Sequence, residues 1–188
     1  NKANSIVGLI RRSFSFLDCD LFKKLYTSFV RPHLEYGQSV WSLHLTKHID
    51  AIENVQIRAT QLIDGFGKYE YSERLRKLKL PTLVYRRLRG DMIEVFKHFH
   101  RYDQHSLPKN FRPQSRSSRK HKFQLTVNKP NDGIRGPQSC SFYFRTAKIW
   151  NDLPRDVDGA NNINAFKNQL DKAWDELPIM FNLPTSDS

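Results

Sequence analysis

The sequence predicts a mainly α-helical protein, and three observations predict it. Through the first hundred residues, apolar side chains recur at spacings of three and four, the period of one helix face. Capping residues precede these apolar segments, and proline or glycine follows them. Clear two-residue alternation, the period of a strand, occurs over one short stretch at 122–127.

Three helices are predicted within residues 6–41. The helical spacing starts at Ile6, and Asp18 is a suitable N-cap for the second helix. Pro32 lacks an N–H and fixes φ, so we expect it to separate the second helix from a third that reaches Trp41. The apolar stripes of these helices comprise Ile6, Leu9, Ile10, Phe14, Leu21, Phe22, Leu25, Tyr26, Phe29, Val30, Leu34, Gly37, Val40 and Trp41.

Three more helices are predicted between Thr46 and Arg101. Thr46 can cap the first of them, which ends at the glycines of 64–67. A short helix near Ser72 stops before Pro81, and a long helix follows. Their apolar positions are Ile52, Val55, Ala59, Leu62, Ile63, Leu75, Leu78, Tyr85, Leu88, Met92, Val95, Phe96 and Phe99.

The chain changes character after the long helix. Residues 103–120 are polar, lack periodicity and are rich in Pro, Ser and Arg, which predicts a basic flexible linker. A short strand or hairpin is expected at 122–133. Two C-terminal helices are predicted at 141–150 and 163–174, the second capped by the Asn pair before it.

Three regions are expected: a helical domain at 1–102, the basic flexible linker at 103–120 and a mixed C-terminal region at 121–188. Positive charge is concentrated in the first two. The net charge of the chain is +12. Residues 1–102 carry +8, residues 103–150 another +8, and residues 151–188 carry −4. This imbalance favours an anionic partner, most simply nucleic acid, over the alternative that the charge serves solubility alone.

Cysteine content and hydropathy favour an intracellular protein, in the cytoplasm and nucleus. Cys19 and Cys140 are the two cysteines, and they form neither a disulfide framework nor a Cys/His cluster. The apolar run Ile6–Ile10 is far shorter than the roughly 18 residues that a membrane span requires. No signal peptide and no membrane partner are predicted.

Seven cations with no intervening acidic residue occupy residues 74–89. Arg86 and Arg89, three residues apart, lie on one face of the predicted long helix. Such a face could neutralise several phosphates and bind nucleic acid without sequence preference. The alternative is an ordinary solvated helix face. The seven cations are Arg74, Arg76, Lys77, Lys79, Arg86, Arg87 and Arg89.

A second basic group lies in and just after the linker. It would suit an arm that follows a nucleic-acid backbone and orders on binding, or it belongs to an ordinary linker. Its members are Lys109, Arg112, Arg116, Arg119, Lys120 and Lys122. Five aromatic residues could stack on bases, although at helical spacing the core is the more usual place for them. They are Tyr26, Tyr36, Trp41, Tyr143 and Trp150.

The sequence suggests no metal site and no catalytic residue. His44 and His48 could share a helix face, but no third ligand falls at a useful spacing. His98 and His100 are two residues apart and point to different helix faces. Nothing resembles the strained turn that exposes a nucleophilic serine.

Four blocks of the sequence together resemble one family of proteins. They are LYTSFVRPHLEYGQSVW at 25–41, IENVQIRATQLI at 52–63, LPTLVYRRLRGDMIEVF at 80–96 and FRTAKIWNDLP at 144–154. In this order they resemble the non-LTR (LINE-type, jockey/CR1-like) retrotransposon reverse transcriptases, in the thumb and post-thumb region that follows the catalytic palm.

The resemblance implies that residues 21–101 grip a duplex of RNA template and DNA primer through its backbone and pack on the palm. Arg31 and Arg58 would then contact phosphates together with the cations of 74–89. Leu25, Phe29, Trp41, Val55 and Leu62 would form the core.

The partners that the resemblance implies are the RNA template, the DNA primer or target, and the upstream palm and endonuclease domains of the same polyprotein. The full enzyme, an RNA-directed DNA polymerase, would use Mg²⁺ and deoxynucleotides. Its metal-binding carboxylates lie in the palm, in a Tyr-x-Asp-Asp turn that this sequence lacks. We therefore expect no enzymatic activity and no cofactor in this chain alone. The alternatives are a free-standing helical nucleic-acid-binding module and a protein-interaction bundle, each derived from a decayed element.

Overall fold

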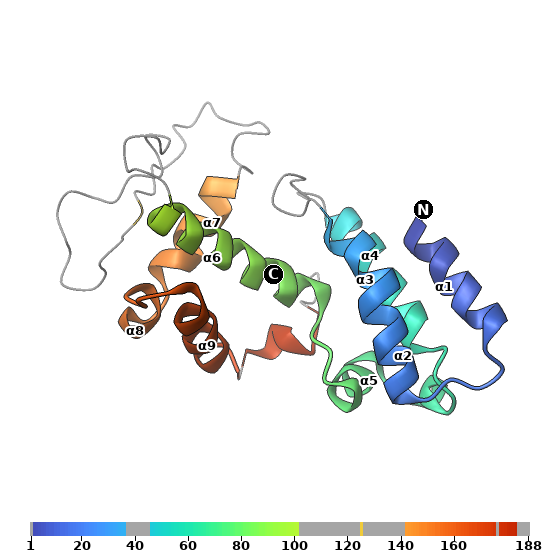
Figure 1. The fold of residues 1–188 in the computed structure, drawn as a ribbon. Helices are drawn as coiled ribbons and strands as arrows, with labels where there is room; N and C mark the ends of the chain where they lie inside the picture. Colours follow the sequence, from blue (N-terminus) through green and yellow to red (C-terminus); the bar gives the residue numbers. More distant parts are fainter. Residues whose placement is uncertain (1, 37–45, 102–124, 126–141, 176, 184–188) are drawn as a thin grey trace. The chain divides into compact units, whose positions relative to one another are not determined.

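The computed structural model describes residues 2–36, 46–101, 125, 142–175 and 177–183, and these residues are mainly helical (Figure 1). The predicted mainly α fold is confirmed. The elements in chain order are α1 (Lys2–Ser13), α2 (Cys19–Leu25), the π-helical turn η1 (Tyr26–Val30), α3 (Arg31–Glu35), α4 (Thr46–Thr60), the 3-10 turn η2 (Phe66–Lys68), α5 (Tyr71–Leu78), α6 (Leu83–Arg101), α7 (Phe142–Asn151), α8 (Arg155–Asp158), α9 (Ile163–Ala173) and the 3-10 turn η5 (Pro178–Met180).

The chain divides into two compact units. The first consists of Asn1–Arg87 and Pro178–Ser188, and the second of Leu88–Leu177. The predicted linker at 103–120 lies outside the described residues, so the expected three-part division stays a prediction.

Two predicted helix caps are confirmed. The Asp18 carboxylate accepts a hydrogen bond from the Leu21 N–H (2.8 Å) and begins α2. The Asn162 side-chain oxygen accepts from the N–H groups of Asn164 (3.0 Å) and Ala165 (2.9 Å) and begins α9. Each cap satisfies backbone donors that have no partner within the first turn of a helix.

Pro32 does not separate two helices, so that prediction is wrong. α2, η1 and α3 follow one another without interruption, and Pro32 lies in the first turn of α3. At the end of η1 the Arg31 N–H bonds to the Tyr26 carbonyl, five residues back. In a regular α-helix the proline ring would clash with the carbonyl four residues back, and the wider π turn relieves that clash. The part of the third helix expected beyond Tyr36 lies outside the described residues.

The first unit has a core built from α1 to α5. Phe22 and Tyr26 stack at 5.5 Å between ring centroids, and Val55 and Leu75 are buried beside them in the same apolar cluster. Ala3 and Ile10 bring α1 into this cluster. The spacing of large apolar side chains therefore predicted most of this core.

Leu9 and Phe29 were predicted on apolar stripes, and the prediction that Phe29 lies in the core is wrong. Each is 56% exposed. The π turn changes the angular position of the residues after Tyr26, and within it Phe29 faces outward, whereas the predicted Val30 and Leu34 are buried. Leu9 and Phe29 line one apolar surface pocket of about 250 Å³ between α1 and η1.

A C-terminal segment returns to the first unit. The Thr82 N–H donates to the Met180 carbonyl (2.9 Å), and the Thr82 hydroxyl donates to the Ile179 carbonyl (2.6 Å). Sequence spacing did not predict this contact, because the two segments are 97 residues apart.

The second unit is organised around stacked aromatic rings. Phe96 of α6 stacks on Phe166 of α9 at 4.4 Å between centroids, and Trp150 of α7 lies 5.8 Å from Phe166 and 5.4 Å from Phe99. The helices predicted at 141–150 and 163–174 are confirmed as α7 and α9, and the short α8 was not predicted.

Leu125 alone of the predicted strand belongs to the described residues. Its N–H donates to the Asn151 side-chain oxygen (2.9 Å), and its carbonyl accepts from the Asn151 amide (2.9 Å). The Asn151 side chain thus pairs with Leu125 as a neighbouring strand would.

Among the described residues, no helix is both long enough and apolar enough to cross a membrane.

Candidate nucleic-acid interface

The seven cations of residues 74–89 have different environments, and they belong to different units. Arg74 is 4% exposed, and its guanidinium donates to the Ile57 carbonyl (3.0 Å) and to the Thr60 hydroxyl (3.0 Å). A guanidinium held inside the core in this way fixes α5 against α4. The expectation that Arg74 forms part of an exposed cationic surface is therefore wrong.

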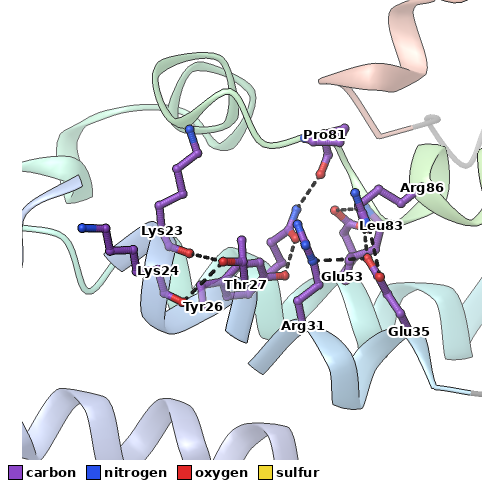
Figure 2. Close-up of polar contacts among 11 residues, drawn as sticks. Lys23, Lys24, Tyr26, Thr27, Arg31, Glu35, Glu53, Pro81, Leu83 and Arg86 are labelled. Carbon is purple, nitrogen blue, oxygen red and sulfur yellow. Dashed lines mark hydrogen bonds and ion pairs between the residues drawn. The ribbon is translucent and has the colours of Figure 1, made fainter. Parts of the chain in front are cut away.

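Two of the other cations are neutralised by distant carboxylates, so the expectation of seven uncompensated charges is also wrong. Arg86 forms an ion pair with Glu35 of α3 through two hydrogen bonds (Figure 2). The Oε1 atom of Glu35 also lies 3.8 Å from the Nε atom of Arg31. In the second unit, Arg89 pairs through Nε (2.6 Å) and Nη2 (2.8 Å) with the carboxylate of Asp171. Arg87 is half-buried.

Three of the predicted cations are exposed at the C-terminal end of α5. Arg76, Lys77 and Lys79 lie within four consecutive residues there, and the exposed Lys68 of η2 contacts the same Tyr69 ring as Lys77. The Lys77 ammonium lies 4.4 Å from the centroid of the Tyr69 ring, and the Lys68 ammonium lies 5.2 Å from it. We call Lys68, Arg76, Lys77 and Lys79 the α5 cation cluster.

Backbone geometry and an aromatic contact position the cluster. Lys79 closes α5 in the left-handed conformation with φ of 52°, the usual way to end a helix but uncommon for a side chain other than glycine or asparagine. Arg76 lies over the Phe181 ring at 5.8 Å and donates to the Asn182 side chain at 3.4 Å. Three members of the cluster, Lys68, Arg76 and Lys77, thus lie against aromatic rings, and all four are exposed and can contact phosphates.

The remaining predicted cations are separate from this cluster. Arg58 of α4 is exposed and donates to the Asn54 carbonyl (3.2 Å) and to the Asn4 side chain (3.0 Å). Arg119 and Lys120 lie outside the described residues, as do His44 and Trp41. Tyr26 and Trp150 are buried core residues, as the core interpretation predicts, whereas Tyr36 is 85% exposed and contradicts it.

A buried polar network lies beneath α5 and was not predicted. The Tyr26 hydroxyl donates to the Gln56 side-chain oxygen, and the Gln56 amide donates to the Tyr71 hydroxyl (2.9 Å) and to the Pro81 carbonyl (3.1 Å). The Tyr71 hydroxyl in turn donates to Glu53. Gln56 and Glu53 are each 1% exposed.

Glu53 links this network to the start of α6. Its carboxylate accepts hydrogen bonds from the Leu83 N–H at 3.0 and 3.3 Å, and so caps the first turn of that helix from α4 (Figure 2). A sequence signal existed, because Glu53 and Gln56 are polar residues three apart beside the apolar positions of α4. Carboxylates are seldom fully buried, so this pattern alone does not predict a buried network.

Burial dominates the ionisation of this network. It raises the pKa of Glu53 above the ordinary 4.5, while the hydrogen bonds from Tyr71 and from the Leu83 and Val84 backbone oppose that change. Burial, and then the negative charge of Glu53, raise the pKa of the Tyr71 hydroxyl and of the Tyr26 hydroxyl. Both phenols stay protonated at neutral pH and act as hydrogen-bond donors.

The contribution of Glu53 to the free energy of unfolding is expected to fall as pH rises above about 4.5. A raised pKa in the folded state means that folding favours the protonated carboxyl. The stabilisation that the Glu53 carboxyl contributes is complete below its pKa in the unfolded chain. It is lost as pH rises through its pKa in the folded chain. Urea unfolding of the wild type and of the Glu53→Gln variant, measured at several pH values, checks this. The difference in unfolding free energy should shrink with rising pH, and a constant difference would contradict the raised pKa.

The described residues contain no group of three or more His, Cys, Asp or Glu side chains that could hold a metal ion. Comparison of the chain with protein-family models, with curated proteins and with solved structures finds no match. The chemistry that the described site offers is the binding of anions by exposed guanidinium and ammonium groups.

Proposed function

We propose that this chain is the thumb and post-thumb part of a non-LTR retrotransposon reverse transcriptase, and that it grips the RNA template and DNA primer. The observation that carries the proposal is the α5 cation cluster, in which three of the four exposed cations lie within four residues at one helix end. The choice of this family rests on the resemblance of the four sequence blocks at 25–41, 52–63, 80–96 and 144–154. On this proposal the palm, Mg²⁺ and deoxynucleotides belong to the rest of the polyprotein.

The mode of binding follows from the chemistry of the cluster. Ammonium and guanidinium groups at a fixed helix end neutralise phosphates and release counterions, so affinity depends on salt and little on sequence. This is what a thumb requires, because it must hold a duplex of any sequence while the duplex advances. Arg86 and Arg89 are engaged with Glu35 and Asp171, and on this proposal they stabilise the fold.

The apolar surface pocket lined by Leu9 and Phe29 supports a protein contact in addition. On the same proposal its occupant is the upstream palm domain, since exposed apolar side chains gathered on one face usually mark an interface. The same observation favours the alternative of a protein-interaction bundle, which would bind its partner without nucleic acid.

Removing three of the four cluster charges is expected to weaken binding of an RNA–DNA duplex and to flatten its salt dependence. The variant combines Arg76→Gln, Lys77→Gln and Lys79→Gly, where glycine suits the positive φ of that position. Each lost phosphate contact should reduce the slope of log K against log salt by about 0.9, so the slope should fall by roughly 2 to 3. Fluorescence anisotropy of a labelled duplex across a salt series measures this slope.

A matched control removes three exposed cations elsewhere, by Lys148→Gln, Arg155→Gln and Lys172→Gln. It changes the net charge equally, so an equal loss of slope would indicate a general charge effect. Salt-independent binding by the wild type would sink the nucleic-acid proposal. The coding sequence upstream decides the family, because an in-frame Tyr-x-Asp-Asp motif is expected there.

A further inference from the structure

A second basic site lies on the first unit, between α1 and α4. It is an open pocket of about 730 Å³, within the size range of small-ligand sites. Val7, Ile10 and Leu17 contribute an apolar floor. The polar lining residues are Asn4 and Arg11 of α1, Arg58 of α4 and Gln61, which directly follows α4.

Positive side chains outnumber negative ones at the pocket. Its lining includes two arginines and no carboxylate, and the nearby Asp64 carboxylate accepts a hydrogen bond from the N–H of the lining residue Leu17 (2.8 Å). Arg58 is held by the Asn54 carbonyl (3.2 Å) and by the Asn4 side chain (3.0 Å). A guanidinium anchored in this way loses little side-chain entropy on binding an anion.

Gly8 lines the same pocket, and packing does not explain it. A Cβ at this position would meet no atom within 4 Å other than Arg12 Nη1, at an ordinary 3.6 Å. Glycine inside a helix nevertheless costs about 1 kcal/mol relative to alanine. The absence of a side chain keeps the wall of the pocket low, which favours a role in admitting a ligand.

We propose that this pocket binds a nucleoside 5′-phosphate, with the phosphate on Arg11 and Arg58 and the base or sugar on the apolar floor. A terminal phosphate carries nearly two negative charges and presents three acceptor oxygens, which suits two guanidinium groups. The amides of Asn4 and Gln61 supply donors and acceptors for the polar edges of a base. The proposal rests on the proposed nucleic-acid function and extends it to the unpaired end of a strand.

The test measures binding of a short single-stranded oligonucleotide with either a 5′-phosphate or a 5′-hydroxyl to the full chain. The phosphorylated strand should bind about tenfold more tightly, the order expected of a charge-assisted contact. Arg11→Gln and Arg58→Gln should abolish this preference, and Gly8→Leu should weaken it, because the leucine side chain would occupy part of the pocket wall. Lys2→Gln is the matched control, because Lys2 is exposed on the same helix and is not among the residues that line the pocket.

Competition separates the sources of the ligand. If adenosine 5′-monophosphate displaces the labelled strand, the pocket binds free nucleotides. If only unlabelled phosphorylated strand displaces it, the pocket binds the phosphorylated end of a strand. Equal binding of the two oligonucleotides, or an equal loss in the Lys2→Gln variant, overturns the inference. Circular dichroism confirms that each variant is folded. Duplex binding with its salt slope intact, but without the phosphate preference, refutes this pocket and leaves the proposed function standing.

Discussion

Replacing Glu53 with alanine is expected to lower the free energy of unfolding by roughly 3 to 5 kcal/mol. The carboxylate is 1% exposed and accepts hydrogen bonds from the Tyr71 hydroxyl and the Leu83 N–H. Its removal leaves both donors buried without an acceptor and creates a cavity, and each unsatisfied donor costs about 1–3 kcal/mol. Urea unfolding followed by far-ultraviolet circular dichroism measures the change.

Two further variants make the Glu53 prediction specific. Asp50→Ala on the same helix removes an equal charge from an exposed position and should cost less than about 0.5 kcal/mol. Tyr71→Phe removes one of the two orphaned donors. The combined loss in the double variant should therefore be at least about 0.5 kcal/mol smaller than the sum of the single losses. Strict additivity, or a Glu53→Ala cost as small as that of Asp50→Ala, would show that the network does not hold α4 to the start of α6.

Replacing Trp150 with alanine is expected to destabilise the second unit by about 3–5 kcal/mol. The indole is 1% exposed and lies against Phe99 and Phe166, at 5.4 and 5.8 Å between ring centroids. Truncation removes a large buried apolar area and leaves a cavity that the neighbouring rings fill only in part. Unfolding followed by circular dichroism, or amide exchange of α6 and α9, reports the loss.

The Trp150 prediction has its own controls. Lys148→Ala changes an exposed residue of the same helix and should leave stability within about 0.5 kcal/mol. Trp150→Phe keeps much of the apolar contact and should cost less than Trp150→Ala. Equal costs for the phenylalanine and alanine variants would mean that the stacked rings are not what stabilises the unit.

The structure changes which charges are worth testing. Substituting Arg86 and Arg89 would remove ion pairs with Glu35 and Asp171, so any loss of nucleic-acid binding could come from altered folding. Arg76, Lys77 and Lys79 are exposed, and their substitution tests binding more directly. The candidate surface is smaller than the sequence suggested, and it is localised to the end of one helix.

Several elements could be predicted because their causes are local. The caps of Asp18 and Asn162 depend on residues two or three positions away, and the sequence identifies them. The effect of Pro32 was misjudged, because proline can pass through a helix when a π turn precedes it. The position of Phe29 was misjudged for the same reason, since the π turn alters the helical period on which the prediction depended.

Composition and the spacing of residues along a few turns predicted the mainly α class, most of the helices and the excess of positive charge. Which cations are paired depends instead on contacts between segments that are far apart in the chain. Glu35 is 51 residues from Arg86, and Asp171 is 82 residues from Arg89, so no local pattern links them. The same holds for the burial of Glu53 against Leu83. Folding brings such distant partners together, and the balance between desolvation and pairing then decides whether a charge is structural or faces a ligand.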